Sequence, residues 1–377
     1  MPLSALPQLA NAALCPRLVL KVGSSLLVDG AGAARAAWLA SLGQDIAALR
    51  RGGTEVIVVS SGAIALGAAR LDLPQRGRRS LADAQAAAAV GQIALAGLWS
   101  ECLGGHGIPA AQLLLTLADL EDRRRYLNVS ATLARLLEAG AVPVINENDS
   151  VATEEIRFGD NDRLAARVAQ AARADAVVLL SDVDGLFNRD PREKGASLVP
   201  VVDGITSEVL AMASSASSSG LGTGGMASKL QAAQIAERAG IALAIINGKH
   251  DEPFSAALTT GLGTLFLPQR SDGARKAWLG GRMAAAGTVR VDNGCAEALA
   301  RGASLLAAGV VGVSGSFRRG DLVRICDMKG RALAQGLSEY DAPECMAIAG
   351  KREDQQADVL GYAPRSCVVH RDHMVLL

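Results

Sequence analysis

The sequence predicts an α/β protein with a mostly parallel central sheet between layers of helices, followed by a small β-rich domain. Its apolar runs are continuous rather than alternating, as in strands that are buried on both faces. Helix-length segments separate these runs, and a repeated strand–helix–strand order favours parallel pairing. After about residue 287 the sequence pattern changes to short strand-like runs separated by glycine turns, and this change predicts the second, smaller domain.

The elements follow from these patterns in order. The predicted strands of the large sheet are 17–22, 55–59, 111–115, 142–146, 176–180, 241–246 and 263–267. Ala-, Leu- and Arg-rich helical patterns between them include 35–51, 80–103, 122–139, 162–173 and 226–239. The later strand-like runs are 288–292, 310–317, 321–327, 330–336 and 367–370.

We therefore divide the chain into an N-terminal extension (1–16), an α/β domain (17–268), a linker (269–286) and a β-rich domain (287–377). The extension is mildly apolar but lacks the basic start of a signal peptide, so we expect a short disordered segment. The Ala-rich stretch 86–99 is too short for a membrane span and is interrupted by Gln92.

Composition limits the possible functions. Lys plus Arg and Asp plus Glu both total 38, so no overall field attracts nucleic acid or anionic lipid. The six cysteines stand singly and there are only four histidines, which gives a zinc site little support. We expect a soluble, reduced protein of the cytoplasm.

Two consecutive strands end in loops that suit an anion. Lys21 ends the first strand and Gly23 follows, which would present an ammonium group and backbone amides where ligands bind in open α/β sheets. Ser60, Ser61 and Gly62 end the second strand before a helix, at its positive N-terminus. A strand-end lysine and a serine helix cap are the simpler alternatives.

An acidic region follows the predicted strand 142–146. Six carboxylates crowd positions 146–162, and their repulsion is costly unless cations or donors lie close by. They are Glu147, Asp149, Glu154, Glu155, Asp160 and Asp162. Lys21 is the kind of partner that would relieve the repulsion, and a solvated acidic loop is the alternative.

Two further segments are typical of nucleotide binding. Ser181 and Asp182 end a strand before a turn and suit a ribose or base, although an ordinary connection would look the same. The Gly-rich run 220–225 opens into a helix with Lys229 in its first turn, which suits a phosphate chain. The run lacks the strand that precedes a dinucleotide fingerprint, and the chain has no P-loop sequence.

None of these motifs contains a histidine. A hydroxyl acceptor usually needs a general base, whereas a carboxylate acceptor is already ionised at neutral pH. Lysines, backbone amides and Mg²⁺ could supply the positioning and charge neutralisation that such a transfer needs. The residues therefore fit the formation of an acyl phosphate.

The segments KVGSS, VVSSGAIALG, VPVINENDSVAT, GDND and SGLGTGGMASKLQAA resemble the signature segments of the glutamate 5-kinases, a branch of the amino acid kinase family. The resemblance runs from about residue 17 to the C-terminus. It implies a three-layer kinase sandwich, a C-terminal PUA domain, and ATP-dependent phosphorylation of L-glutamate on its side-chain carboxylate, the first step of proline biosynthesis.

The resemblance also implies residue roles. Lys21 and Lys229 would stabilise the transferring phosphoryl group, and Asp162 would orient them. Glutamate would be held by Ser61, Asp149 and Asn161, with Asp149 a partner for its ammonium group. ATP would contact Lys21, Ser181, Asp182, Thr223, Gly224, Gly225, Met226, Ala227, Ser228 and Lys229.

Mg²⁺ would arrive with the nucleotide, so no protein metal ligand is expected. Family members are commonly inhibited by proline and act as oligomers. Two alternatives stay open: an amino acid kinase that acts on aspartate, acetylglutamate or a carbamate, and an RNA-binding PUA protein. Residues 287–377 contain 11 Lys or Arg and 11 Asp or Glu, so we expect at most weak RNA binding.

Overall fold

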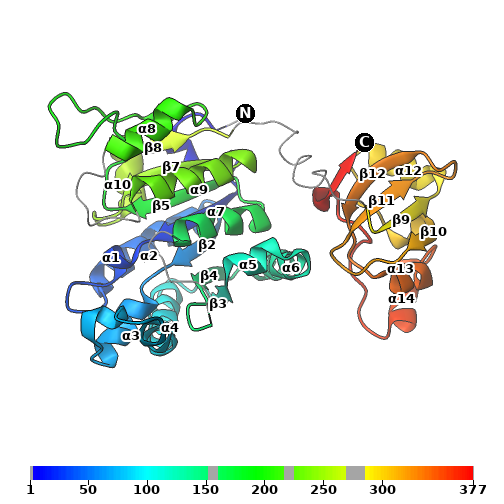
Figure 1. Ribbon diagram of the computed structural model, residues 1–377, viewed down its shortest axis with the longest axis horizontal. Coiled ribbons are helices and arrows are strands. Elements are labelled where there is room, and N and C mark those ends of the chain that lie inside the picture. Colours follow the sequence, from blue (N-terminus) through cyan, green and yellow to red (C-terminus); the bar gives the residue numbers. More distant parts are fainter. Residues whose placement is uncertain (1–2, 152–159, 216–224, 269–284, 377) are drawn as a thin grey trace. The chain divides into compact units, whose positions relative to one another are not determined.

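The computed structural model describes residues 3–151, 160–215, 225–268 and 285–376, and the chain forms two compact units (Figure 1). The first comprises residues 1–120 and 129–270, and the second residues 121–128 and 271–377. Most of the expected linker at 269–286 lies outside the described residues. The expected domain boundaries therefore stay a prediction.

The first unit is built on an eight-stranded sheet with the order β3-β4-β2-β1-β5-β7-β8-β6. Neighbouring strands pair in parallel except β7 with β8, which confirms the mostly parallel sheet. All the strands predicted for this sheet are present, and among its described residues only the two-residue β6 was missed, because so short a run has no pattern. The strands are β1 (Arg17–Val22), β2 (Glu55–Ser60), β3 (Ala110–Leu115), β4 (Val142–Glu147), β5 (Ala176–Ser181), β6 (Val201–Val202), β7 (Ala242–Asn247) and β8 (Thr264–Phe266).

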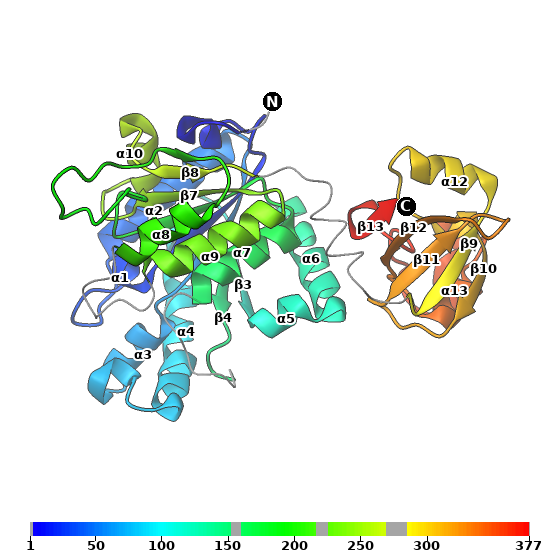
Figure 2. The ribbon, with the colours of Figure 1, turned by 45° about the horizontal axis from the view of Figure 1, so that its top comes forward.

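Helices cover both faces of this sheet and confirm the three-layer sandwich. On one face, α2, α4 and α10 share a core with even-numbered strand residues such as Leu18 and Leu20. On the other face, α7 and α9 lie side by side and contact β1 and β7 (Figure 2). The helices are α1 (Ser24–Leu27), α2 (Ala36–Arg51), α3 (Ala63–Arg70), α4 (Leu81–Gly104), α5 (Leu117–Glu121), α6 (Arg123–Glu138), α7 (Asp160–Ala172), α8 (Ser207–Ser215), α9 (Met226–Arg238) and α10 (Pro253–Thr260).

The prediction of a disordered N-terminal extension is wrong for the described residues from 3 onward. A 3₁₀ helix spans Leu6–Ala10, and Leu6 and Leu9 are buried in the core of the first unit. Leu3 and Cys15 join the same cluster. The apolar character of this segment therefore reflects packing, because these side chains bury enough surface to order the backbone.

One helix, α4, is long and apolar enough to cross a membrane by length and composition alone. Its Leu95, Trp99 and Leu103 are buried in the same core as α2. Gly91 lies so close to α3 that a Cβ there would be 1.8 Å from the carbonyl oxygen of Ala63. One side of α4 therefore packs into the core of the first unit.

The second unit holds a five-stranded sheet with the order β10-β9-β11-β12-β13. Its strands are β9 (Gly287–Val291), β10 (Val310–Gly315), β11 (Leu322–Cys326), β12 (Ala332–Leu337) and β13 (Met374–Leu376), and its helices include α12 (Asn293–Ala300), α13 (Ala342–Ala347) and α14 (Glu353–Leu360). The strand predicted at 367–370 is wrong. Val368 and Val369 are buried, which produces the apolar pattern, but Val369 forms only an isolated bridge with Leu305.

Candidate active site

Lys21 lies near the carboxyl end of β1, inside the sheet between β2 and β5. Its strand neighbours Leu20 and Val22 face the α2 side, so alternation turns Lys21 toward α7 and α9. The side chain is only 9% exposed. A buried ammonium group needs a charged or polar partner, because leaving it unpaired is very costly.

Asp162, in the first turn of α7, is that partner. Its Oδ1 lies 2.5 Å from Lys21 Nζ and its Oδ2 lies 3.2 Å from Lys229 Nζ. One buried carboxylate thus joins two lysines that are far apart in the sequence. The predicted convergence of Lys21, Lys229 and Asp162 is what the structure shows.

The charges of this cluster shift one another's pKa values. Burial lowers the pKa of the Lys21 ammonium, Asp162 opposes that shift, and the charge of Lys229 adds to it. Burial alone would raise the pKa of Asp162, but the two ammonium groups outweigh burial and hold that pKa below its usual value. Two ammonium groups thus share one carboxylate in a buried place, and this arrangement can hold them toward a phosphate.

Lys229 is the fourth residue of α9, and Gly225 is the N-cap of that helix. Met226, Ala227 and Ser228 form the turn between them, so the backbone amides of the helix start lie close in sequence to the ammonium group. This is the arrangement expected of a phosphate-binding helix start. The predicted contacts at Thr223 and Gly224 lie outside the described residues.

Ser181 is the last residue of β5, the neighbour of β1, and Asp182 follows it. The Ser181 hydroxyl donates to Asp182 Oδ1 at 3.3 Å, and Lys249 Nζ donates to the backbone carbonyl of Asp182 at 3.1 Å. Asp182 is among the groups that raise the pKa of Lys21, so the two charges lie close enough to interact. The structure therefore brings the segment after β5 to the lysine cluster, together with Lys249, which the sequence analysis did not single out.

Ser61 and Asn161, two of the predicted glutamate-binding residues, contact each other. The Nδ2 atom of Asn161, in the first turn of α7, donates to Ser61 Oγ at 2.6 Å. Gly62 makes the turn after Ser61 with a φ of +116°, a conformation that favours glycine. Since Asn161 precedes Asp162, the turn of α7 connects the proposed substrate residues to the lysine cluster.

Asp149, the third predicted substrate residue, follows β4 and interacts electrostatically with Arg78. Burial is the main cause that lowers the pKa of Arg78, and the carboxylate of Asp149 opposes that shift. Within the acidic region, Lys21 pairs with Asp162 as expected. Glu154 and Glu155 lie outside the described residues.

Three polar residues of this site were not assigned a role from the sequence. Gln92 Oε1 accepts from Asn146 Nδ2 at 2.8 Å, and Asn146 Oδ1 accepts from Asn161 Nδ2 at 3.3 Å. Trp99 Nε1 donates to Ser60 Oγ at 2.9 Å. In the sequence, Gln92 could have been singled out because it is a polar residue that interrupts an Ala-rich helix.

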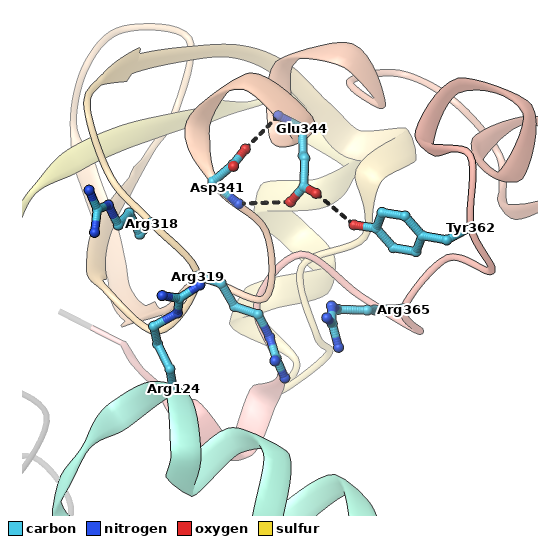
Figure 3. A pocket seen from close by; sticks show the side chains of 7 residues that line it. All are labelled: Arg124, Arg318, Arg319, Asp341, Glu344, Tyr362 and Arg365. Carbon is cyan, nitrogen blue, oxygen red and sulfur yellow. Dashed lines mark hydrogen bonds between the residues drawn. The ribbon is translucent and has the colours of Figure 1, made fainter.

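The second unit holds a pocket of its own (Figure 3). Residues of the β-rich part that line it are Arg318, Arg319, Asp341, Glu344, Tyr362 and Arg365. Both carboxylates that line the pocket accept hydrogen bonds. The Asp341 carboxylate accepts from the backbone N–H of Glu344. The Glu344 carboxylate accepts from the Tyr362 hydroxyl and from the backbone N–H of Asp341.

The adjacent residues Arg318 and Arg319 differ in their surroundings. Arg318 is exposed, but the Arg319 side chain is only 14% exposed and lies 3.3 Å from Glu339 Oε2. None of the predicted site residues lines this pocket.

Comparisons with known proteins agree with this geometry. The Amino acid kinase family matches residues 16–247, and the PUA domain matches residues 287–360. A glutamate 5-kinase of Novosphingobium aromaticivorans is 64% identical over all of both chains. A glutamate 5-kinase of Sphingopyxis alaskensis is 59% identical over 96% of this chain and 98% of its own length. A glutamate 5-kinase of Zymomonas mobilis is 56% identical over 96% of this chain and 92% of its own length.

Proposed function

The chain belongs to the amino acid kinase family, and from that premise we propose that it phosphorylates L-glutamate. ATP donates its γ-phosphoryl group to the side-chain carboxylate, which yields ADP and L-glutamyl 5-phosphate for proline biosynthesis. The full-length relatives named glutamate 5-kinase support this substrate. The observation that carries the proposal is the buried Lys21–Asp162–Lys229 cluster next to Ser61 and Asn161.

The chemistry needs no general base. The carboxylate oxygen of glutamate, ionised at neutral pH, attacks the γ-phosphorus while the bond to the β-phosphate oxygen breaks. Negative charge then spreads over the transferring group and the leaving ADP. Lys21 and Lys229 neutralise that charge, and Asp162 holds both ammonium groups in place without cancelling their combined charge.

Each end of the site has its own residues in this proposal. Ser61, Asp149 and Asn161 hold glutamate, and Asp149 accepts from its ammonium group. Ser181, Asp182 and the start of α9 hold ATP, with Lys21 and Lys229 at its terminal phosphate. We also assign Thr223 and Gly224 to the nucleotide site. For these two residues the assignment rests on the sequence alone.

We also propose that Mg²⁺ enters with the nucleotide, held mainly by phosphate oxygens, where it neutralises phosphate charge. Among the residues that the structure describes, no three His, Cys, Asp or Glu side chains are grouped so as to hold a metal ion. We therefore name no protein ligand for it.

The remaining parts of the proposal come from the family resemblance. The protein is a soluble, cytoplasmic homo-oligomer, with no membrane attachment, that proline inhibits by competing for the glutamate site. Residues 17–268 form the kinase domain, 269–286 the linker and 287–377 the PUA-like domain. RNA binding is at most weak, since the charges of this domain balance.

A hydroxamate assay tests the proposed function. Purified protein with ATP, Mg²⁺ and hydroxylamine should convert L-glutamate to its hydroxamate with equal release of ADP. Aspartate and N-acetylglutamate, tested in parallel, should give none, and the Lys229→Ala variant serves as the inactive control. Activity with either of those acids but not with glutamate would move the enzyme to another acceptor within the family.

A further inference from the structure

A chain of side-chain amides connects α4 to the predicted glutamate site. Gln92 accepts from Asn146, Asn146 accepts from Asn161, and Asn161 donates to Ser61, at 2.8, 3.3 and 2.6 Å. These residues come from α4, β4, the start of α7 and the loop after β2. Gln92 follows Gly91, where α4 approaches α3 closely.

The direction of this chain is set at its Ser60 end. The backbone carbonyl of Ser60 can only accept, and it lies 3.4 Å from Asn161 Nδ2, so the amide nitrogen faces that side. Asn146 must then offer its carbonyl oxygen to Asn161 and its nitrogen to the opposite side. There Gln92 Oε1 accepts, which leaves every link with one donor and one acceptor.

The direction determines what Ser61 can do. A hydroxyl has one proton and two acceptor positions, and Asn161 occupies one acceptor position of Ser61 Oγ. The Ser61 proton is therefore available to an acceptor outside the chain of amides. Were Asn161 reversed, its carbonyl would take that proton and Ser61 would face a ligand as an acceptor.

We propose that Gln92 is a positioning residue of the glutamate site, which acts through Asn146 and Asn161 to keep the Ser61 hydroxyl a donor toward a carboxylate oxygen of the substrate. This inference rests on the proposed function. Asn146 is 2% exposed, so loss of its acceptor would leave a buried amide N–H unpaired and favour a turn of that amide. Gln92 itself reaches Ser61 only through the two asparagines.

Steady-state kinetics of the full-length enzyme test this proposal. Gln92→Met keeps the shape but removes the acceptor, and it should raise KM for glutamate about tenfold, as expected for one lost buried hydrogen bond. KM for ATP should change less than about twofold, because the nucleotide residues lie outside the chain of amides. Gln92→Glu still accepts from Asn146 and should retain a KM for glutamate within about threefold of the wild type.

Two controls separate positioning from a general structural effect. Gln112→Met makes the same chemical change at an exposed position of β3 and should leave both KM values unaltered. In a Ser61→Ala background, Gln92→Met should add less than about twofold to KM for glutamate, because residues that act as one unit are not additive. Full additivity of the two substitutions would overturn the proposal.

The remaining outcomes are also decisive. Equal increases in KM for glutamate and for ATP, or no increase in a folded Gln92→Met enzyme, would refute a role at the glutamate site. Should Gln92→Met not fold, a folded Gln92→Glu variant decides: a wild-type KM supports the proposal, and a tenfold rise contradicts it. A wild type without glutamate-dependent hydroxamate would instead defeat the proposed function, before any variant is compared.

Discussion

Each unit of this protein has a largely buried ionic cluster, and the two differ in the residues that they join. In the first unit, Asp162 contacts the ammonium groups of Lys21 and Lys229, which are predicted site residues. In the second unit, Glu339 lies 3.3 Å from Arg319 and 3.8 Å from the His373 imidazole, neither of which is a predicted site residue. We therefore expect the first cluster to serve catalysis and the second to serve the fold.

The two carboxylates respond alike to their surroundings. Burial would raise the pKa of each, but Lys21 and Lys229 lower that of Asp162, and His373 and Arg319 lower that of Glu339. The contrast therefore lies in the cations and not in the acids. It predicts that substitutions in the first cluster affect catalysis, while those in the second affect stability alone.

Removal of Asp162 should have the largest effect. Asp162→Ala leaves two ammonium groups close together, one of them buried, and should lower the free energy of unfolding by about 3–5 kcal/mol. Urea denaturation followed by circular dichroism measures this. An unchanged midpoint would mean that the two lysines do not depend on Asp162.

Removal of either lysine should reduce catalysis most selectively. Lys21→Ala and Lys229→Ala should each lower kcat by about 100- to 1000-fold, because each removes charge aimed at the transferring phosphoryl group. Arg319→Ala in the second unit is the matched control and should keep kcat within about twofold of the wild type. Equal losses in all three variants would abolish the distinction between the clusters.

The ionic cluster of Glu339, Arg319 and His373 should make the stability of the protein depend on pH in the acidic range. The pKa of Glu339 in the folded protein lies below its ordinary value of 4.5. Its carboxylate therefore contributes fully to stability above pH 4.5, and this contribution is lost as the pH falls through the pKa of the folded state. Glu339→Gln should therefore cost about 1–3 kcal/mol at pH 7 and flatten the loss of stability below pH 4.5. Thermal unfolding across this range measures both, and an unchanged acid slope would contradict the role.

The histidines should matter least. His106, His250, His370 and His373 are absent from the lysine cluster and from the Ser61 network. Replacement of each by Asn should leave kcat within about twofold, because an ionised carboxylate needs no general base. A hundredfold loss in any one variant would require a proton-transfer step that the present mechanism lacks.

The ionic cluster could be predicted from the sequence because its residues stand in recognisable local patterns. Lys21 ends an apolar strand, Lys229 follows a glycine run, and Asp162 ends GDND. The amide chain could not be predicted, since Gln92 and Asn146 are 54 positions apart and stand in no local pattern that links them.

Elsewhere, burial explains the wrong expectations. The N-terminal segment was read as disordered, yet Leu6 and Leu9 pack into the core. Residues 367–370 were read as a strand because they are apolar, yet their burial comes without sheet pairing beyond one bridge. Apolar patterns show what is buried more reliably than which backbone conformation buries it.

Isotope transfer tests the central claim most directly. Glutamate labelled with ¹⁸O in its side-chain carboxylate would be incubated with the wild-type enzyme, ATP, Mg²⁺ and hydroxylamine, which cleaves the acyl bond of an acyl phosphate. If the carboxylate oxygen attacks the γ-phosphorus, the released phosphate carries one ¹⁸O atom for each hydroxamate formed. Phosphate that carries no label would mean that water and not glutamate accepts the phosphoryl group.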